Sequence, residues 1–222
     1  MGASEALGFL SLDGIVYEWL SALRLFSVEA LIILGPDPFS TEESRLVRAV
    51  QPANLLLAAQ TLAKSGDFGV AWDDFMAPLV GWEDIADAIP EATQGWRMLC
   101  VGHGLQSVLR IAFPMTGGRA FECYLFSSLK WHDQNDAAQL AWSAFIKWPA
   151  LKQALIQAHS PLSPREIECL KLAFKGLTAK ESSQKMACAE RTVTFHITNA
   201  MTKLKADNKL AAIQRACWFG LF

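Results

Sequence analysis

Residues 190–205 read ERTVTFHITNAMTKLK, and the spacing of their apolar residues indicates an amphipathic helix with two different faces. The apolar side chains recur every three or four residues, as on a helix that packs against a core. They are Val193, Ile197, Ala200, Met201 and Leu204. A second face is short and polar, and it carries Arg191, Thr194, Thr198 and Thr202, with Asn199 and Lys203 beside them. Such a face suits either solvent or the major groove of DNA, so the flanking sequence has to decide.

The flanking sequence contains the boundary signals of three more helices. Residues 163–166 (SPRE) form a capping box with proline at the first helical position, and Gly176 ends that helix. Residues 178–181 (TAKE) form a second capping box, and Asn208 caps a last helix with Gly220 just beyond it. Four short helices in about 60 residues, the second and third joined by a short turn, predict an all-α helix-turn-helix unit.

The charge of the chain is divided unevenly between its two parts. The 222 residues carry a formal net charge of −2, but the part from Pro161 onward holds ten basic and five acidic residues. That part therefore has a formal charge of +5 and the remainder −7. A basic module attached to an acidic body indicates binding to a polyanion, which favours the groove over solvent for the polar face.

Composition excludes several classes of protein. The chain is 52% hydrophobic and 19% charged, as expected of a soluble globular protein, and no apolar run reaches the roughly 18 residues of a membrane span. No basic segment precedes the first apolar residues, so a secretory signal is not expected. The five cysteines are odd in number and scattered, which predicts free thiols, no structural zinc and a cytoplasmic location.

The first part of the chain combines apolar strands with amphipathic helices. Strands are expected in three segments, 28–36, 105–115 and 117–129, with a hairpin turn at Thr116-Gly117-Gly118. Helices are expected at 17–26, at 53–66 with Gly66 as its end, and at 135–159, where Pro149 is either a kink or the first residue of a new helix. We therefore predict two domains, an α/β sandwich with a central antiparallel sheet flanked by helices (1–158) and the helix-turn-helix domain (159–222).

The second domain resembles the C-terminal DNA-binding domain of LuxR-type transcriptional regulators over about 60 residues. The matching positions are Glu166, Leu170, Gly176, Thr192, Val193, His196, Asn199, Ala200, Lys203, Leu204 and Asn208. The resemblance implies that the third helix is the recognition helix and that the last helix helps to pair two domains on a dyad-symmetric site. Two features depart from the family: Ser182-Ser183 replace Ile-Ala, and Ala189 replaces a capping Ser, a loss of about 1 kcal/mol.

The resemblance and the polar face together give a set of candidate DNA contacts. They are Thr178, Lys180, Glu190, Arg191, Thr192, Thr194, Thr198, Asn199, Lys203 and Lys209. Residues at the start of the recognition helix are expected at base edges, and Lys203 is expected near a phosphate.

The first domain is similar to acyl-homoserine-lactone receptors in the order of its segments. The positions that the resemblance assigns to the ligand pocket are Gln51, Trp72, Asp73 and Gly104. In that family an Asp before a Pro accepts a hydrogen bond from the signal, whereas here Gln51 precedes Pro52, and residues 34–57 lack the usual Trp and Tyr. An uncharged acceptor makes the weaker bond, so ordinary lactone recognition is not expected. A pocket filled by the protein's own aromatic side chains would let the domain fold without a ligand.

Two versions of the function remain open from the sequence. The chain is expected to be a homodimeric regulator that binds double-stranded DNA, with a small-molecule signal or a related regulator protein as its further partner. In the alternative version the first domain is a ligand-independent dimerisation module, and the chain antagonises a related regulator by heterodimerising with it. An enzyme, a cofactor and a metal site are not expected, because His132, Asp133, His196 and the pair Asp73-Asp74 form no nucleophile–base or metal-ligand set. A receiver domain is excluded by the lack of an acidic pair after a first strand.

Overall fold

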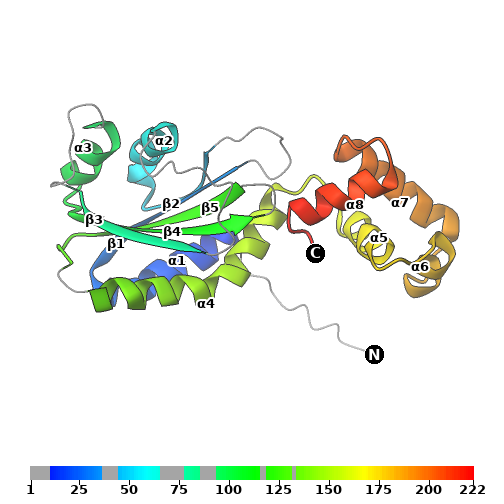
Figure 1. The fold of residues 1–222 in the computed structure, drawn as a ribbon, viewed down its shortest axis with the longest axis horizontal. Helices are drawn as coiled ribbons and strands as arrows, with labels where there is room; N and C mark the ends of the chain where they lie inside the picture. The colour runs from blue at the N-terminus through cyan, green and yellow to red at the C-terminus, as the bar shows by residue number, and fades with distance from the viewer. Residues whose placement is uncertain (1–10, 37–44, 66–77, 86–93, 116–118, 132–133) are drawn as a thin grey trace. The chain divides into compact units, whose positions relative to one another are not determined.

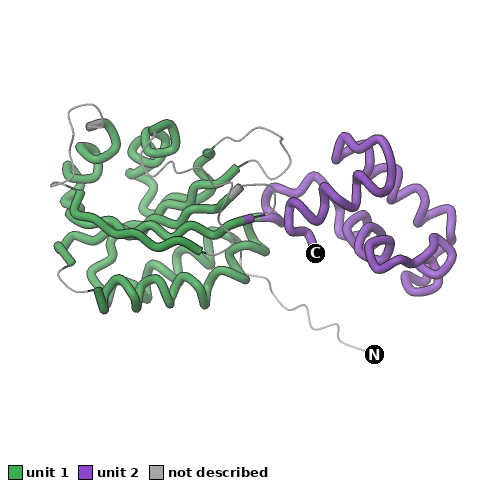
Figure 2. Tube along the Cα trace, viewed as in Figure 1, with its two compact units in different colours: residues 1–36, 43–114, 118–155 green, residues 37–42, 115–117, 156–222 purple. Residues whose placement is uncertain are grey.

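The computed structural model describes residues 11–36, 45–65, 78–85, 94–115, 119–131 and 134–222 (Figure 1). The chain divides into two compact units (Figure 2). The first unit extends to Leu155, and the second contains the whole segment from Ile156 to the C-terminal residue. Among the described residues, no helix combines the length and the apolarity that a membrane crossing requires.

The first unit is built on a five-stranded sheet with the order β2-β1-β5-β4-β3. The strands are β1 (Val28–Gly35), β2 (Leu46–Gln51), β3 (Leu79–Asp84), β4 (Ser107–Met115) and β5 (Arg119–Ser127). Strand β1 pairs antiparallel with β2 and with β5, and β3 pairs antiparallel with β4. The expected strands at 28–36, 105–115 and 117–129 are confirmed, while the turn expected at 116–118 lies outside the described residues.

Helices cover both faces of this sheet (Figure 1). Helices α1 (Leu12–Leu23) and α4 (Gln134–His159) lie on one face, and α2 (Leu56–Lys64) and α3 (Gln94–Gly102) lie on the other. The short 3₁₀ helix η1 (Arg24–Phe26) follows α1, and a second one, η2 (Ala53–Leu55), precedes α2. Because both faces are covered, the interior strand β1 is an almost continuous apolar run with seven of its eight residues buried. The predicted sandwich, a central antiparallel sheet flanked by helices, is confirmed.

Helix α4 is continuous through Pro149, so no new helix starts there. Its side chains pack on the sheet: the rings of Trp148 and Phe113 are stacked with centroids 4.1 Å apart. It is also joined to α1, because the Trp19 indole N–H donates to the Ser143 hydroxyl at 2.7 Å. The domain boundary predicted after residue 158 falls in the last turn of this helix, close to the division between the units.

The second unit contains four helices, as the boundary signals predict. They are α5 (Pro164–Phe174), α6 (Ala179–Lys185), α7 (Glu190–Lys203) and α8 (Lys209–Trp218). Gly176 follows α5 with a φ of +82°, a left-handed conformation that glycine adopts without strain, and its N–H donates to the Ala173 carbonyl. The all-α helix-turn-helix architecture is confirmed.

Candidate nucleic-acid interface

Helix α7 is held in the second unit by its apolar stripe. Val193 is fully buried with Cys169 of α5 and Met186 after α6, which fixes the first turns of α7 against the preceding helices. Ala200 and Leu204 belong to a second cluster with α5 and α8. Ile197 and Met201 are partly buried at the margins of these clusters. The inward face predicted from the sequence is therefore the face that packs, and the opposite side of the helix is left to solvent.

Side-chain caps begin three of the four helices of this unit. The Ser163 and Thr178 hydroxyls accept the N–H groups of Glu166 and Glu181, and each glutamate accepts the N–H of its cap residue in return. The Asn208 side chain accepts the Ala211 N–H at 2.9 Å. Helix α7 has the extended backbone of a cap residue at Ala189 but no side-chain cap. The loss of the cap predicted at Ala189 is confirmed, because this residue has the backbone conformation of a cap but no side-chain acceptor.

The C-terminal end of α7 is fastened by two charged side chains. The Lys203 ammonium lies 2.9 Å from the Oε2 atom of Glu166, whose side chain is almost completely buried at the start of α5. Burial acts to raise the pKa of this carboxyl, but hydrogen bonds from Lys203 and Ser163 outweigh it, so the pKa lies below its ordinary value. The Arg215 guanidinium of α8 donates to the carbonyls of Leu204 and Lys205, both at 2.5 Å. Lys203, expected near a phosphate, therefore also positions the helix in the free protein.

The exposed side of α7 carries most of the residues predicted to contact DNA. Arg191 and Thr198 lie near the middle of this side, Glu190 and Thr194 on one edge, and Thr192 and Asn199 on the other. The hydroxyls of Thr194, Thr198 and Thr202 each donate to the carbonyl four residues earlier, at 3.0 to 3.2 Å. Such bonds leave the hydroxyl lone pairs free to accept and direct the methyl group away from the helix backbone.

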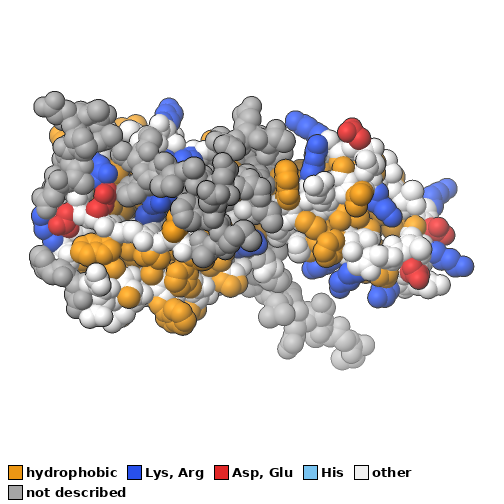
Figure 3. Space-filling view, viewed as in Figure 1, with side chains coloured by type: hydrophobic (Ala, Val, Ile, Leu, Met, Phe, Trp, Pro, Cys, Tyr) orange, Lys and Arg blue, Asp and Glu red, His pale blue; other side chains and the backbone are white. Residues whose placement is uncertain are grey.

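The remaining predicted contacts lie at the starts of the neighbouring helices. Lys180 is exposed in the first turn of α6, and Lys209 is the exposed first residue of α8. The Thr178 hydroxyl is already used in its capping box, so it is less available than a free hydroxyl. On the visible face of the second unit, Lys and Arg side chains outnumber Asp and Glu (Figure 3). Such a surface suits a phosphate backbone.

Phe195 was not recognised as part of this surface from the sequence. Its side chain is 61% exposed on α7, one turn after Arg191 and one turn before Thr198. The sequence pattern contained a signal for it, because Phe195 falls outside the spacing of the apolar stripe. An aromatic residue outside the buried stripe of a helix is expected on its surface.

The two serines that depart from the family pattern are accommodated inside the unit. Ser182 and Ser183 are both buried on α6. The Ser183 hydroxyl donates to the Lys180 carbonyl at 2.7 Å, which satisfies a polar group that would otherwise be costly to bury.

Among the described residues no group of three or more His, Cys, Asp or Glu side chains is placed to hold a metal. The five cysteines are free, and burial raises the pKa of Cys169 to about 11, so this thiol stays protonated.

In the first unit, the four residues expected at a ligand pocket are not brought together by any described contact. Gln51 is a half-buried residue at the end of β2. Gly104 is exposed in the turn after α3, where a φ of +79° accounts for the glycine. Trp72 and Asp73 lie outside the described residues. The left-handed conformation of this turn accounts for a glycine at position 104 without any contact to a ligand.

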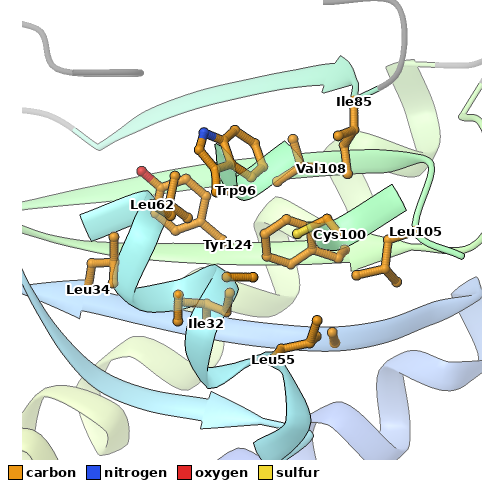
Figure 4. Packing of buried hydrophobic residues seen from close by; sticks show 14 residues of the cluster. Ile32, Leu34, Leu55, Leu62, Ile85, Trp96, Cys100, Leu105, Val108 and Tyr124 are labelled. Carbon is orange, nitrogen blue, oxygen red and sulfur yellow. The ribbon is translucent and has the colours of Figure 1, made fainter. Parts of the chain in front are cut away.

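The layer between the sheet and helices α2 and α3 is filled with apolar side chains (Figure 4). Trp96 of α3 and Tyr124 of β5 lie at the centre of this cluster, and both are almost completely buried. Fourteen buried residues form the cluster: Ala30, Ile32, Leu34, Leu55, Ala58, Ala59, Leu62, Ile85, Trp96, Cys100, Leu105, Val108, Tyr124 and Phe126. Neither of these two aromatic residues was among the four positions predicted for the pocket.

A buried network of polar groups borders this cluster. The Arg45 guanidinium donates to both carboxylate oxygens of Glu122, at 2.9 and 3.1 Å, and to the Tyr124 hydroxyl at 2.8 Å. Arg110 donates to the same carboxylate at 3.1 Å, and the Tyr124 hydroxyl is hydrogen-bonded to it as well. Arg45 also donates to the carbonyls of Leu62 and Ser65 at the end of α2. The network therefore links α2 to β5 through hydrogen bonds to a shared carboxylate.

Comparison with known proteins gives the second unit a family. Residues 160–216 match the family described as "Bacterial regulatory proteins, luxR family". A stretch of 64 residues is 41% identical to the transcriptional activator protein LuxR of Aliivibrio fischeri, covering 29% of this chain and 26% of that protein. The transcriptional activator protein SolR of Ralstonia solanacearum is 32% identical over 146 residues, 63% of this chain and 57% of that protein. The chain thus matches less than two thirds of the length of either relative.

A solved structure extends the likeness to both units. The structure "SdiA in complex with octanoyl-rac-glycerol" matches with a TM-score of 0.52 at 18% identity, covering 100% of this chain and 98% of that chain. At this identity the match shows a shared fold. The order of a sheet-and-helix unit and a four-helix unit is therefore common to both proteins. Together with the family match and the packing of α7, these findings identify residues 160–216 as a helix-turn-helix domain of the luxR family of bacterial regulatory proteins.

Proposed function

We propose that the chain is a DNA-binding transcriptional regulator that acts as a homodimer on a dyad-symmetric promoter site. The observation that carries the proposal is the exposed face of α7, which presents Arg191 and a row of threonines on a helix fixed from behind by the core of a luxR-family domain. A recognition helix needs this combination, because its outer side chains must reach base edges while the helix itself stays in place.

The face offers specific chemistry for the major groove. The Arg191 guanidinium can donate two parallel hydrogen bonds to the O6 and N7 atoms of guanine. Thr194 and Thr198 can accept from the exocyclic amino groups of adenine or cytosine, because their own protons are already donated to the helix backbone. Glu190, Thr192 and Asn199 would contact bases or sugars at the margins of the footprint. Lys180 and Lys209, each in the first turn of its helix, would bind phosphates.

Two exposed apolar surfaces, one in each unit, support pairing with a second copy. On α4, Trp142 and Ile146 are four residues apart and 66% and 64% exposed, beside a groove of about 700 Å³ that Phe26 also lines. Apolar side chains gather over α4 on the visible face of the first unit (Figure 3). On α8, Leu210 is 73% exposed, and Trp218, eight residues later, lies on the same side of the helix. A self-complementary contact through such surfaces produces the two-fold symmetry that a dyad site requires.

The first unit is proposed to fold without an acyl-homoserine lactone. The space between the sheet and α2 and α3 is occupied by Trp96, Tyr124 and their neighbours, and the polar groups of Arg45 and Glu122 bond to each other. The octanoyl-rac-glycerol of the SdiA structure belongs to that protein, with which this chain shares 18% identity. The filled layer also favours the alternative function, in which the unit serves only for dimerisation and the chain antagonises a related regulator.

Arg191→Ala tests the proposed DNA contact. Specific binding should weaken by about 1–3 kcal/mol if the guanidinium reads a base edge. The measurement is a fluorescence-anisotropy titration of the full chain against a duplex selected from a random library. Arg165→Ala is the matched control, because Arg165 is an exposed arginine of α5 in the same unit, paired with Glu168. Equal affinities for the wild type and Arg191→Ala would contradict the assignment.

A thermal-shift panel tests the proposal for the first unit. The protein expressed without any lactone should be soluble, and its melting temperature should stay constant when a series of acyl-homoserine lactones is added. A ligand that binds only the folded state raises the melting temperature with its concentration. Such a rise with one compound would refute the filled-pocket proposal and support a small-molecule sensor.

A DNA-binding assay separates the homodimer from the antagonist. The homodimer should bind DNA as the chain alone, whereas the alternative requires mixing with a related regulator.

A further inference from the structure

Phe195 occupies a position on α7 that neither packing nor capping explains. The residues that contact the core lie at 193, 197, 200 and 204, and the side of the helix opposite to them is formed by 191, 195, 198 and 202. Phe195 is thus in the middle of the exposed side, 61% exposed, and its described ring contact is with the neighbouring His196 ring, at 5.9 Å. Single exposed apolar residues are common, but this one lies in the row that would face DNA.

The side chains next to Phe195 make the row partly apolar. Arg191 precedes it by one turn, and Thr198 and Thr202 follow at three and seven residues. The Thr198 and Thr202 hydroxyls donate to carbonyls of their own helix, so their methyl groups are the parts that project outward. The exposed row therefore presents one guanidinium, then a benzyl group, and then two methyl groups beside hydroxyl oxygens that can still accept.

The major groove offers one apolar group to such a row, the C5 methyl of thymine. A phenyl ring cannot form the hydrogen bonds that distinguish guanine, adenine and cytosine at their edges. We propose that Phe195 is a specificity-determining residue that packs on thymine methyl groups in the major groove, beside a guanine bound by Arg191. This inference rests on the proposed DNA-binding function and adds to it the kind of base that the centre of the helix reads.

The geometry also sets where the thymine should be. Phe195 is four residues after Arg191, a distance of about 6 Å along the helix axis. Successive bases of one strand are about 3.4 Å apart. The thymine should therefore lie within about two base pairs of the guanine that Arg191 contacts.

Binding-site selection with the full chain gives the first test. Duplexes selected from a random library by the wild type should contain a thymine at this distance from a required guanine. Phe195→Ala should select sites with the same guanine but without the thymine preference, and Phe195→Leu, which keeps an apolar side chain, should retain part of it. Phe174→Ala is the matched control, because Phe174 is a similarly exposed phenylalanine on α5 of the same unit. It should select the wild-type site.

Replacement of single thymines by deoxyuridine gives the second test, because it removes only the methyl group. Wild-type affinity should fall about fourfold at one or two thymines, the factor that corresponds to burying one methyl-sized group. The affinity of Phe195→Ala should not change at the same positions. An equal loss for both proteins, or no loss for the wild type at any thymine, would overturn the inference while leaving DNA binding intact. If the wild type selects no duplex at all, the proposed function itself fails.

Discussion

Ala189→Ser should stabilise the second unit by restoring the one missing helix cap. Ala189 has a φ of −78° and a ψ of 149°, the backbone conformation of a cap residue, and its carbonyl already accepts the N–H groups of Thr192 and Val193. The side chain is exposed, so a hydroxyl group can be added without disturbing the core. A serine hydroxyl there can accept the N–H of Arg191, or share the N–H of Thr192 with the Ala189 carbonyl, as cap side chains do at these positions.

The expected gain is about 1 kcal/mol, within a range of about 0.5–2 kcal/mol for capping residues. Ser163, Thr178 and Asn208 already supply this interaction to the other three helices of the unit. If the second unit unfolds as a separate transition, 1 kcal/mol raises its melting temperature by roughly 4–8 °C, as for a domain of 60–100 residues. If the whole chain unfolds together, the rise is roughly 2–4 °C.

Differential scanning calorimetry of the full chain measures this change and shows which transition moves. Ala189→Thr and Ala189→Val form a matched control pair, because the two side chains have the same shape and only threonine carries a hydroxyl. Threonine should stabilise α7 relative to valine. If the serine variant melts with the wild type, or if threonine and valine behave alike, a missing cap does not limit the stability of this helix.

Two further changes test the contacts that hold each unit. Glu166→Gln should lower the melting temperature of the second unit most at neutral pH, because the pKa of Glu166 is depressed in the folded state. The stability that the carboxylate contributes is complete above its unfolded pKa of about 4.3 and is lost as the pH falls through its folded pKa. The wild type and the variant should therefore have similar melting temperatures in acid, and a difference that does not depend on pH would contradict the ion pair. Trp96→Ala should lower the free energy of unfolding of the first unit by about 3–5 kcal/mol in urea titrations, because the indole lies at the centre of the buried cluster, and should leave the second unit unchanged. A decrease below about 1 kcal/mol would mean that the layer is not tightly packed.

The second unit was predictable from sequence because its signals are local. Three of the four helix starts are specified by residues no more than three positions apart, such as Ser163 with Glu166, and the helix ends by a glycine or a turn. The inward face of α7 follows from spacing alone. The same spacing places Phe195 on the outer face, but the polar residues around it hide this phenylalanine in the pattern.

The strands of the first unit were predictable only where they are mostly apolar. The interior strands β1, β4 and β5 have long apolar runs because both of their faces are buried. The edge strands β2 and β3 were missed, since LVRAVQ and LVGWED mix polar and apolar residues over six positions. The network around Arg45 could not be predicted from the sequence either, because its partners Glu122 and Tyr124 are 77 and 79 residues away along the chain. Only the antiparallel pairing of the strands brings these groups together.

The two ends of α7 are restrained to different degrees, and this difference bears on how the helix would bind. Its C-terminal end is held by Lys203 and Arg215, whereas the first turn, which carries Arg191, has backbone hydrogen bonds and no cap. Fraying of an uncapped helix end lowers affinity, because the conformational freedom that is lost on binding opposes association. Ala189→Ser should therefore raise DNA affinity together with stability, since a cap would reduce the fraying of the first turn in the free protein. A serine variant that is more stable but binds the selected duplex more weakly would show instead that the first turn has to rearrange in the groove.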